Sequence, residues 1–382
     1  MVTGATGSAT GQAPHRLSWQ HHLRQAWLHR GVVAVLLWPL SWIYGALVRA
    51  RNLTYRLGCW HSQRLPVPVV VVGNVVVGGA GKTPTVIAIV RHLQRQGHRP
   101  GVISAGHGRD RSERGAADSV VEVLDDTPAT LAGDEPLLLR QATQVPVFVA
   151  RQRAQAGQAL LARHPDTTVL VCDDGLQHLA LHADVAVAVF DERGVGNGWL
   201  LPAGLLREPW PEHIGRPVDL VLRVLAKPGQ GAPLPCPAGV PVFDAHKQLA
   251  ECAVSPRGQR VPLAELGQPD QAPITALAGI AKPEAFFDML RTAQLPLAEC
   301  WAMADHQNYV ELFNSKLFNK LDRKTLIFTE KDAVKLFPLL RGITPASGQL
   351  RAWAVPLVLT PDPAFLAALD ERLSSRHGLQ TA

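Results

Sequence analysis

The chain alternates short apolar runs with stretches in which apolar residues recur at helical spacing. Residues 69–72 form a run of valines, typical of a strand buried on both faces of a parallel sheet. Apolar residues from Val86 to Leu93 then recur at helical spacing, and Gly97 predicts the end of that helix. Further apolar runs predict strands at residues 101–104, 145–149, 169–172, 185–190 and 218–224. This alternation indicates a doubly wound α/β sheet.

The pattern changes after residue 226 and then repeats on a smaller scale. Residues 227–271 are rich in proline, glycine and short polar runs, which marks a linker region. A second α/β pattern follows, with a strand at 274–279, a helix opened by Pro283, and the segments KTLIFTEKDAVKLF and WAVPLVL. We therefore expect a tail and membrane-associated helical segment in 1–60, a P-loop domain in 61–230, a linker in 231–271 and a smaller C-terminal α/β domain in 272–382.

The N-terminal segment contains one long uncharged stretch in place of short apolar runs. Residues 1–14 are small and polar, which predicts disorder, whereas residues 31–48 carry no charge. Pro39 and Ser41 weaken a membrane span, but five of the nine tryptophans lie within the first 60 residues, as at a lipid interface. We expect a helical segment that associates with the membrane. A buried helical hairpin of the soluble domain is the alternative.

Composition and charge narrow the class of protein. The 382 residues are 47% hydrophobic and 18% charged, which describes a globular chain with a sizeable core. The net charge of +6 favours anionic partners, namely a nucleotide, a phospholipid surface or nucleic acid. Five cysteines without a CxxC pair fit a reducing compartment and no disulfide framework. We expect a monomer in the cytoplasm, associated with the membrane and without a nucleic-acid partner.

The segment GNVVVGGAGKTP lies between the first predicted strand and the first predicted helix. Glycines there let backbone N–H groups converge at a helix N-terminus, an arrangement that binds phosphate. Lys82 is expected to reach the outer phosphates, and the Thr83 hydroxyl to ligate Mg²⁺. Val76 replaces the first glycine of the standard pattern, so this is a variant P-loop, with an ordinary glycine-rich turn as the alternative. The expected nucleotide-binding residues are Gly78, Gly79, Ala80, Gly81, Lys82 and Thr83.

A pair of carboxylates follows a later strand in the segment VLVCDDGLQH. Asp173 and Asp174 are predicted at the carboxyl edge of the sheet, beside the P-loop, where an aspartate commonly holds Mg²⁺ on nucleotide phosphates. Adjacent side chains alternate in direction, so only one of the two faces the metal directly. A plain Asp-Gly turn is the alternative. The spacing of Gln177 and His178 along the chain indicates no chemical role for either residue.

The remaining polar motifs have local structural explanations. Asp134 in LAGDEPLLLR is explained by a helix N-cap, and Thr329 with Asp332 in TEKDAVK fits a capping box. Asp305 beside His306 is a weak signal alone.

Two further segments carry charge beside apolar or helical sequence. The apolar segment LLPAGLLREP ends in Arg207 and Glu208, consistent with a loop that faces lipid or sugar. Arg153 could contact phosphates or simply lie at the solvated start of a helix.

Taken in order, these segments resemble the tetraacyldisaccharide 4′-kinase family, the lipid A 4′-kinases of Gram-negative bacteria. The matching segments are GNVVVGGAGKTP, GDEPLLL, CDDGLQH, LPAGLLREP, AGIAKPEAFF, DHQNY and TEKDAVK, which together span residues 70 to 335. Each is modest alone, but their shared order is specific. The resemblance implies two α/β domains joined by a small β linker, with the active site in the cleft between them.

The resemblance also implies an activity. It implies ATP- and Mg²⁺-dependent phosphoryl transfer to the 4′-hydroxyl of a lipid disaccharide 1-phosphate at the cytoplasmic face of the inner membrane. By the same resemblance Asp134 and His306 act together in catalysis, with Lys82 and with Mg²⁺ held by Thr83 and Asp173. Further family positions near nucleotide or substrate match Asp174, Arg153, His178, Arg207 and Glu208.

One loop departs from the family pattern. The family has an Arg and a Tyr in a motif like SRGYG after the second strand, where this chain has SAGHG with Ala105 and His107. If that Arg assists phosphate binding, its role is either lost or taken by a neighbour such as Arg109.

Two other classes of protein compete with a kinase. A membrane-associated P-loop NTPase switch or assembly factor is one, because DERG at 191–194 matches a DxxG pattern, although the chain has no NKxD motif. A basic membrane-surface protein with a vestigial P-loop is the other, and the intact Lys82, Thr83 and Asp173 argue against it.

Overall fold

The structure is a computed structural model. It describes residues 26–106, 109, 119–212, 215–226, 233–268, 273–305, 309–310, 325–341 and 351–377.

A nine-stranded sheet in the order β15-β8-β7-β6-β1-β5-β2-β4-β3 forms the first α/β unit. Its strands are β1 (Val69–Gly73), β2 (Pro100–Ser104), β3 (Val121–Val123), β4 (Val147–Val149), β5 (Val169–Asp173), β6 (Val185–Asp191), β7 (Leu220–Leu225), β8 (Val242–Leu249) and β15 (Leu357–Pro361). Every pairing is parallel except those of β3 and β15 at the two edges. The strands predicted between residues 69 and 224 are thus confirmed, each within a few residues.

Helices cover both faces of this sheet, so the doubly wound prediction is confirmed. Val70 and Val72 of β1 point into one core, which contains side chains from α3 (Lys82–Arg95), α5 (Asp134–Thr143) and α11 (Pro363–His377). Val69 and Val71 point into the other core, with α6 (Arg153–Arg163). The short helix α4 (Ala129–Ala132) precedes α5. Alternating burial on both faces explains why β1 is made of valine.

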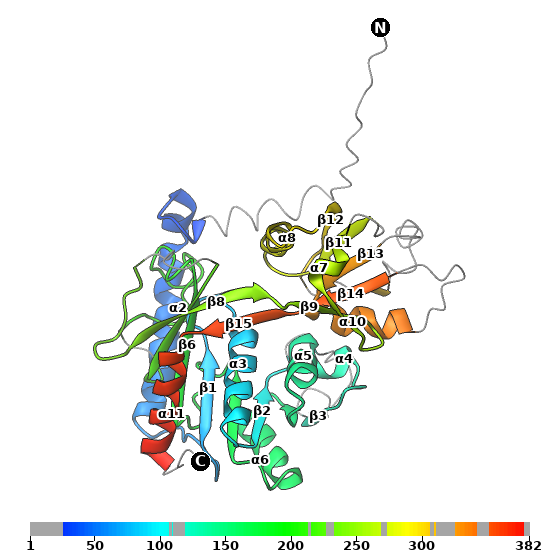
Figure 1. The fold of residues 1–382 in the computed structure, drawn as a ribbon. Coiled ribbons are helices and arrows are strands. Elements are labelled where there is room, and N and C mark those ends of the chain that lie inside the picture. The colour runs from blue at the N-terminus through cyan, green and yellow to red at the C-terminus, as the bar shows by residue number, and fades with distance from the viewer. Residues whose placement is uncertain are drawn as a thin grey trace.

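A six-stranded sheet in the order β10-β9-β14-β13-β11-β12 forms the second α/β unit. It contains β9 (Cys252–Val254), β10 (Arg260–Pro262), β11 (Ile274–Ala278), β12 (Leu297–Ala302), β13 (Thr325–Thr329) and β14 (Arg351–Val355), with helices α7 (Leu263–Leu266), α8 (Pro283–Thr292) and α10 (Glu330–Arg341). Figure 1 shows this unit beside the first, with the β8–β15 pair reaching toward it.

The strand pairing corrects the expected domain boundaries. The segment WAVPLVL divides at Pro356, since β14 belongs to the second sheet while β15 pairs with β8 in the first. Helix α11 then buries Phe365, Leu369 and Leu373 in the core of the first unit. Residues 272–382 are therefore not one domain, and β8 within the expected linker is a strand of the first sheet. The apolar face of α11 decides this, because it packs on β6, β7 and β8 of the first sheet, far earlier in the chain.

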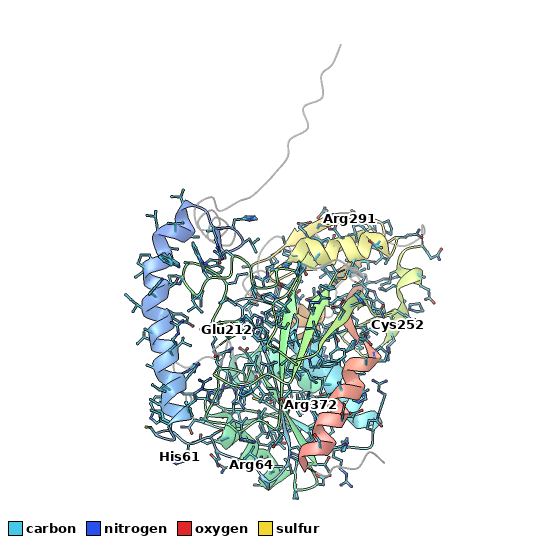
Figure 2. All side chains as sticks on the ribbon, turned by 90° about the vertical axis from the view of Figure 1, so that its left-hand side faces the viewer. His61, Arg64, Glu212, Cys252, Arg291 and Arg372 are labelled. Carbon is cyan, nitrogen blue, oxygen red and sulfur yellow. The ribbon has the colours of Figure 1, made fainter. Side chains whose placement is uncertain are left out.

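The N-terminal apolar segment is a single helix, α2 (Val32–Arg56), which continues through Pro39. Its buried positions are small or polar: Ala34, Ser41, Gly45, Val48 and Asn52. Its exposed positions include Leu36, Trp38, Leu40, Trp42, Ile43 and Leu47. Figure 2 shows α2 along one edge of the molecule with side chains directed outward. The alternative of a buried helical hairpin is therefore wrong for residues 32–56.

Polar contacts attach α2 to the loop at residues 199–208. The Ser41 hydroxyl donates to the carbonyl of Leu200 at 2.8 Å and accepts the N–H of Ala203 at 3.0 Å. The Tyr44 hydroxyl donates to the carbonyl of Arg207 at 2.8 Å. The helix thus packs with its polar side and leaves its apolar side open. Among the described residues, α2 is also the helix long and apolar enough to cross a membrane.

We predict that Ser41→Ala lowers the free energy of unfolding by about 1–3 kcal/mol, because two buried backbone groups lose their partner. The matched control is Ser375→Ala on α11, where an exposed hydroxyl donates only to the carbonyl of Arg372, and we expect a change within about 0.5 kcal/mol. Urea denaturation followed by tryptophan fluorescence measures both. Equal losses in the two variants would contradict the role of Ser41 in attaching α2.

Candidate functional site

The P-loop forms the turn between β1 and α3. Gly78 and Gly81 have φ of 101° and 89°, a left-handed conformation that favours glycine, and Lys82 begins α3. The Lys82 ammonium donates to Asn74 Oδ1 at 3.1 Å, and Asn74 Nδ2 donates to the carbonyl of Gly78 at 3.2 Å. The turn is therefore already arranged with the N-terminus of α3 facing outward, as an anion site requires.

Val76 explains why this P-loop departs from the standard pattern. Residue 76 forms an antiparallel β-bridge with Leu206, and its side chain is completely buried. The N–H of Val77 donates to the carbonyl of Leu205 at 2.9 Å, so the loop is paired on both sides of Val76. An extended, buried position suits valine and does not need the backbone freedom of glycine. The same bridge brings the loop at 199–208 next to the P-loop.

Asp174 faces Lys82 directly. It follows β5 with a φ of 50°, and its carboxylate lies 3.4 Å from both Lys82 Nζ and Arg207 Nη1. Asp174 lies in a turn, as the Asp-Gly pair predicts, and the N–H of Gly175 donates to the carbonyl of Val72 on the neighbouring strand β1. Asp174 therefore belongs both to this turn and to the candidate site, since it lines the cavity described below.

Asp173 is buried behind Asp174, with 1% of its surface exposed. Its Oδ1 has no hydrogen-bond partner within the part of the chain that the structure describes. Burial, together with the carboxylates of Glu135 and Asp174, raises the pKa of Asp173 to about 7, against the opposing effect of Lys82. A buried carboxylate oxygen without a partner fits a cation ligand, which would supply the missing interaction.

A cavity of about 460 Å³ opens from the P-loop toward the second unit. Lys82, Thr83 and Arg207 line it from the first unit, and Lys282 and Lys331 line it from the second. An apolar wall completes it: Val224, Leu225, Ile280, Phe286, Met289 and Leu357. One cavity therefore combines a phosphate-binding turn with an apolar surface suited to a planar base.

Asp134 lies in the first turn of α5 and is not the N-cap that its local sequence predicts. The N-cap is Gly133, with φ of 91° and no side-chain capping bond. The carboxylate of Asp134 is buried and lies 2.9 Å from Nζ of Lys335 on α10. This ion pair connects the first unit with the second, and a second connection joins Lys282 Nζ to Glu192 at 2.5 Å and to Asp191 at 3.5 Å.

The predicted cap of α10 by the Thr329 side chain is confirmed, and Asp332 has a second role. The N–H of Asp332 donates to Thr329 Oγ1 at 3.2 Å, which caps α10. The Asp332 carboxylate also accepts the hydroxyls of Thr329 and Tyr309, each at 2.6 Å. Burial and Asp332 raise the pKa of Tyr309, so this hydroxyl keeps its proton. The ammonium of Lys335 lies 5.4 Å above the Tyr309 ring, so the network reaches the partner of Asp134.

His306 and His107 lie outside the described residues. Asp305, the neighbour of His306, is described, lines the cavity and lies 2.7 Å from Lys331 Nζ. Arg109, the expected replacement in the departing loop, donates to Ser119 Oγ at 3.3 Å and does not line the cavity.

Three predicted substrate residues do not line the P-loop cavity. The Arg153 guanidinium is buried and donates to the carbonyls of Ala150 and Arg151. The Arg153 N–H donates to Nε2 of His178 at 3.4 Å. Glu208 accepts the N–H of Gly215 at 3.0 Å and lies 3.4 Å from Arg51 of α2. Of the predicted substrate residues, the structure brings Arg207 alone to the cavity.

Lys335, Tyr309 and Lys282 belong to the site or to its supporting contacts, but the sequence did not predict a role for them. A signal for Lys335 was present, because residues 332 and 335 share one face of a helix whose first turn was already identified. Lys282 gave no such signal, since its partners Asp191 and Glu192, at and just after the end of β6, are 91 and 90 residues away.

Known proteins share this sequence over nearly its whole length. Residues 33–374 match the family described as tetraacyldisaccharide-1-P 4′-kinase. A tetraacyldisaccharide 4′-kinase of Polaromonas naphthalenivorans is 48% identical over 366 residues, covering 94% of this chain and 98% of that protein. One of Acidovorax sp. strain JS42 is 51% identical over 353 residues, covering 92% and 94%. The "apo" form of LpxK from Aquifex aeolicus in complex with ATP, a crystal structure, has a TM-score of 0.71 at 23% identity, over 90% of this chain and 100% of that one, which shows a shared fold.

His178 should make stability depend on pH. Burial and then Arg153, Arg216 and Arg51 lower its pKa from 6.5 to about 4. Between pH 6.5 and 4 the unfolded chain binds a proton that the folded chain does not, so this contribution to stability is lost as pH falls.

We predict that the unfolding free energies of the wild type and His178→Gln differ by a pH-dependent amount. Relative to the variant, the free energy of unfolding of the wild type should fall by roughly 1 kcal/mol per pH unit as pH drops from 6 to 4.5. This slope is below the full value for one proton because His178 is only half-buried. The raised pKa of Asp173 makes the free energy of unfolding rise as pH falls. This effect is present in both proteins, so it cancels in their difference. Urea denaturation across this range tests it, and parallel curves would contradict the lowered pKa.

Proposed function

This chain belongs to the tetraacyldisaccharide-1-P 4′-kinase family, and from that premise we propose that it transfers the γ-phosphoryl group of ATP to the 4′-hydroxyl of a tetraacyldisaccharide 1-phosphate, a step in lipid A biosynthesis. One observation carries the proposal. Lys82 and Glu135 line one cavity between the units, and Asp134 directly precedes Glu135 at the start of α5. Helix α10 supplies Lys331 to the cavity and Lys335 to Asp134. A phosphate site beside a candidate proton acceptor is what phosphoryl transfer to a hydroxyl needs.

Lys82 and Arg207 supply the positive charge at the phosphate end. Both contact the carboxylate of Asp174 at 3.4 Å, which holds their side chains in the cavity. The β- and γ-phosphates of ATP compete with Asp174 for these cations when the nucleotide binds. The charge that develops on the phosphate oxygens during transfer is then stabilised by groups already in position.

Asp134 is the proposed general base. Its carboxylate accepts the proton of the sugar 4′-hydroxyl while that oxygen bonds to the γ-phosphorus and the bond to the ADP oxygen breaks. Lys335 holds the carboxylate in place at 2.9 Å. We propose that His306 orients Asp134, as the family resemblance implies. Its neighbours Asp305 and Tyr309 are anchored to Lys331 and Asp332 of α10.

The residues present fit Mg²⁺. The Thr83 hydroxyl lines the cavity, and the buried Asp173 has an oxygen without a partner among the described residues. Among the described residues, no group of three or more His, Cys, Asp or Glu side chains is placed to hold a metal ion by itself. Mg²⁺ bound with a nucleotide generally keeps several waters and takes further ligands from the phosphates. When bound, Mg²⁺ neutralises phosphate charge and orients the phosphates.

We propose that α2 attaches the enzyme to the cytoplasmic face of the bacterial inner membrane as a monomer. Its apolar residues and Trp38 and Trp42 face outward, and its polar side contacts the loop at 199–208 that also pairs with the P-loop. The acyl chains of the lipid can thus stay in the bilayer while the disaccharide reaches the cleft.

We predict that Asp134→Asn lowers kcat at least about 100-fold while changing the Kd for ATP by less than about threefold. The assay follows transfer from labelled ATP to detergent-solubilised tetraacyldisaccharide 1-phosphate. The matched control is Asp125→Asn, an exposed residue that pairs with Arg140, and it should keep wild-type turnover.

Near-normal turnover in Asp134→Asn would remove Asp134 from the mechanism. Wild-type ATP hydrolysis without a phosphorylated lipid would instead favour the alternative of an NTPase switch. The DERG segment gives little support to an NTPase switch, because its Asp191 already pairs with Arg193 at 2.8 Å and with Lys282.

We predict that Leu36→Glu with Ile43→Glu lowers partition onto anionic phospholipid vesicles by about 100-fold, because both exposed side chains lie on one face of α2. Activity on detergent-solubilised substrate should remain. The control is Leu124→Glu with Leu131→Glu, two exposed leucines outside α2, which should leave partition unchanged. Equal vesicle binding in both double variants would contradict attachment through α2.

A further inference from the structure

Lys247 lies on β8 and points toward the P-loop. A Cβ built at Gly81 would lie 3.4 Å from Cε of Lys247 and 3.2 Å from the methyls of Val224. Lys247 also lines the cavity that contains Lys82 and Thr83. The end of its side chain is therefore next to the last glycine of the phosphate-binding turn.

Lys247 is a half-buried cation without a hydrogen-bond or ion-pair partner among the described residues. The carboxylates that act on Lys247 electrostatically are Asp191 and Glu192, and other cations already pair with both. Arg193 lies 2.8 Å from Asp191, and Lys282 lies 2.5 Å from Glu192. Burial lowers the pKa of Lys247, with Lys282 and Arg193 acting in the same direction and Asp191 and Glu192 opposing them. An excess of positive charge thus remains at this point of the cavity.

Such a charge is unfavourable in the free protein and favourable once an anion arrives. Two groups of residues around Lys247 indicate which kind of anion binds there. Gly81 directly precedes α3, whose N-terminus favours phosphate, and Val224 and Leu225 form the apolar wall beside Lys247. A ligand held here therefore has phosphate next to an apolar group, as a nucleotide does.

We propose that Lys247 is a nucleotide-binding residue whose ammonium contacts a phosphate group of bound ADP or ATP near the base. This deepens the proposed function and rests on its nucleotide site. Because β8 pairs with β15 and the chain continues from it into the second sheet, the contact joins the nucleotide to the connection between the two units.

The test compares Lys247→Met, which keeps the apolar stem and removes the ammonium, with wild type. Isothermal calorimetry measures the Kd for ADP, ATP and adenosine, and thermal unfolding measures the ligand-free protein. We expect the Kd for ADP and ATP to rise about tenfold, and the Kd for adenosine to stay unchanged because adenosine has no phosphate. The ligand-free Tm should stay equal or rise, because an unpaired cation has been removed.

The matched control is Arg95→Met, which removes one exposed positive charge at the end of α3 and should change neither Kd nor Tm. An unchanged Kd for ADP in Lys247→Met would overturn the inference. So would a lower ligand-free Tm with an unchanged Kd, since Lys247 would then act as a structural partner of Asp191 and Glu192. If Lys247→Met does not fold, Lys247→Gln gives the same comparison with a polar side chain. Failure of the wild type to bind ADP would overturn the proposed kinase itself, separately from Lys247.

Discussion

The ion pair between the buried Asp134 and the half-buried Lys335 is the contact on which the arrangement of the cleft depends. It joins α5 of the first unit to α10 of the second at 2.9 Å, next to the network of Tyr309, Asp332 and Thr329 that fixes the start of α10. A buried ion pair contributes little net stability compared with apolar packing, but breaking it leaves an uncompensated charge. Its importance here is therefore positional: it sets where the second unit lies relative to the P-loop. In the proposed kinase the same contact orients the base.

The chain also connects the two units covalently in a way that keeps them together. It leaves the first sheet after β8, builds the second sheet, and returns through β15 and α11, which buries three large apolar side chains in the first core. The antiparallel β8–β15 pair therefore reaches from one unit toward the other, and Lys247 and Leu357 on it line the cavity. A nucleotide in this cavity would touch both units and their connection, so its binding and the position of the second unit are physically coupled.

Helix α2 reverses the usual distribution of apolar and polar side chains. Its buried face uses Ser41, Gly45 and Asn52, while leucine, isoleucine and tryptophan are exposed. Such an exposed apolar face on a soluble protein is unfavourable unless a bilayer or a partner covers it. The small buried side chains allow close contact with the loop at 199–208, and this loop pairs with the P-loop through Val76 and Leu206. Helix α2 and the P-loop are thus separated by a single loop.

The sequence by itself determined the elements whose signals are local. The strands β1, β2 and β4 to β7, the P-loop turn, the cap at Thr329 and the length of uncharged sequence in α2 all follow from patterns within a few residues. Local reasoning also explained Asp134 as a helix cap, which is wrong, because Gly133 takes that position and the carboxylate is drawn to Lys335, 201 residues further along the chain. The return of β15 and α11 to the first sheet and the convergence of Lys247 with Gly81 were likewise decided only by the tertiary structure. Pairing between distant segments depends on which apolar faces and charges meet when the units pack, and no spacing along the chain encodes that.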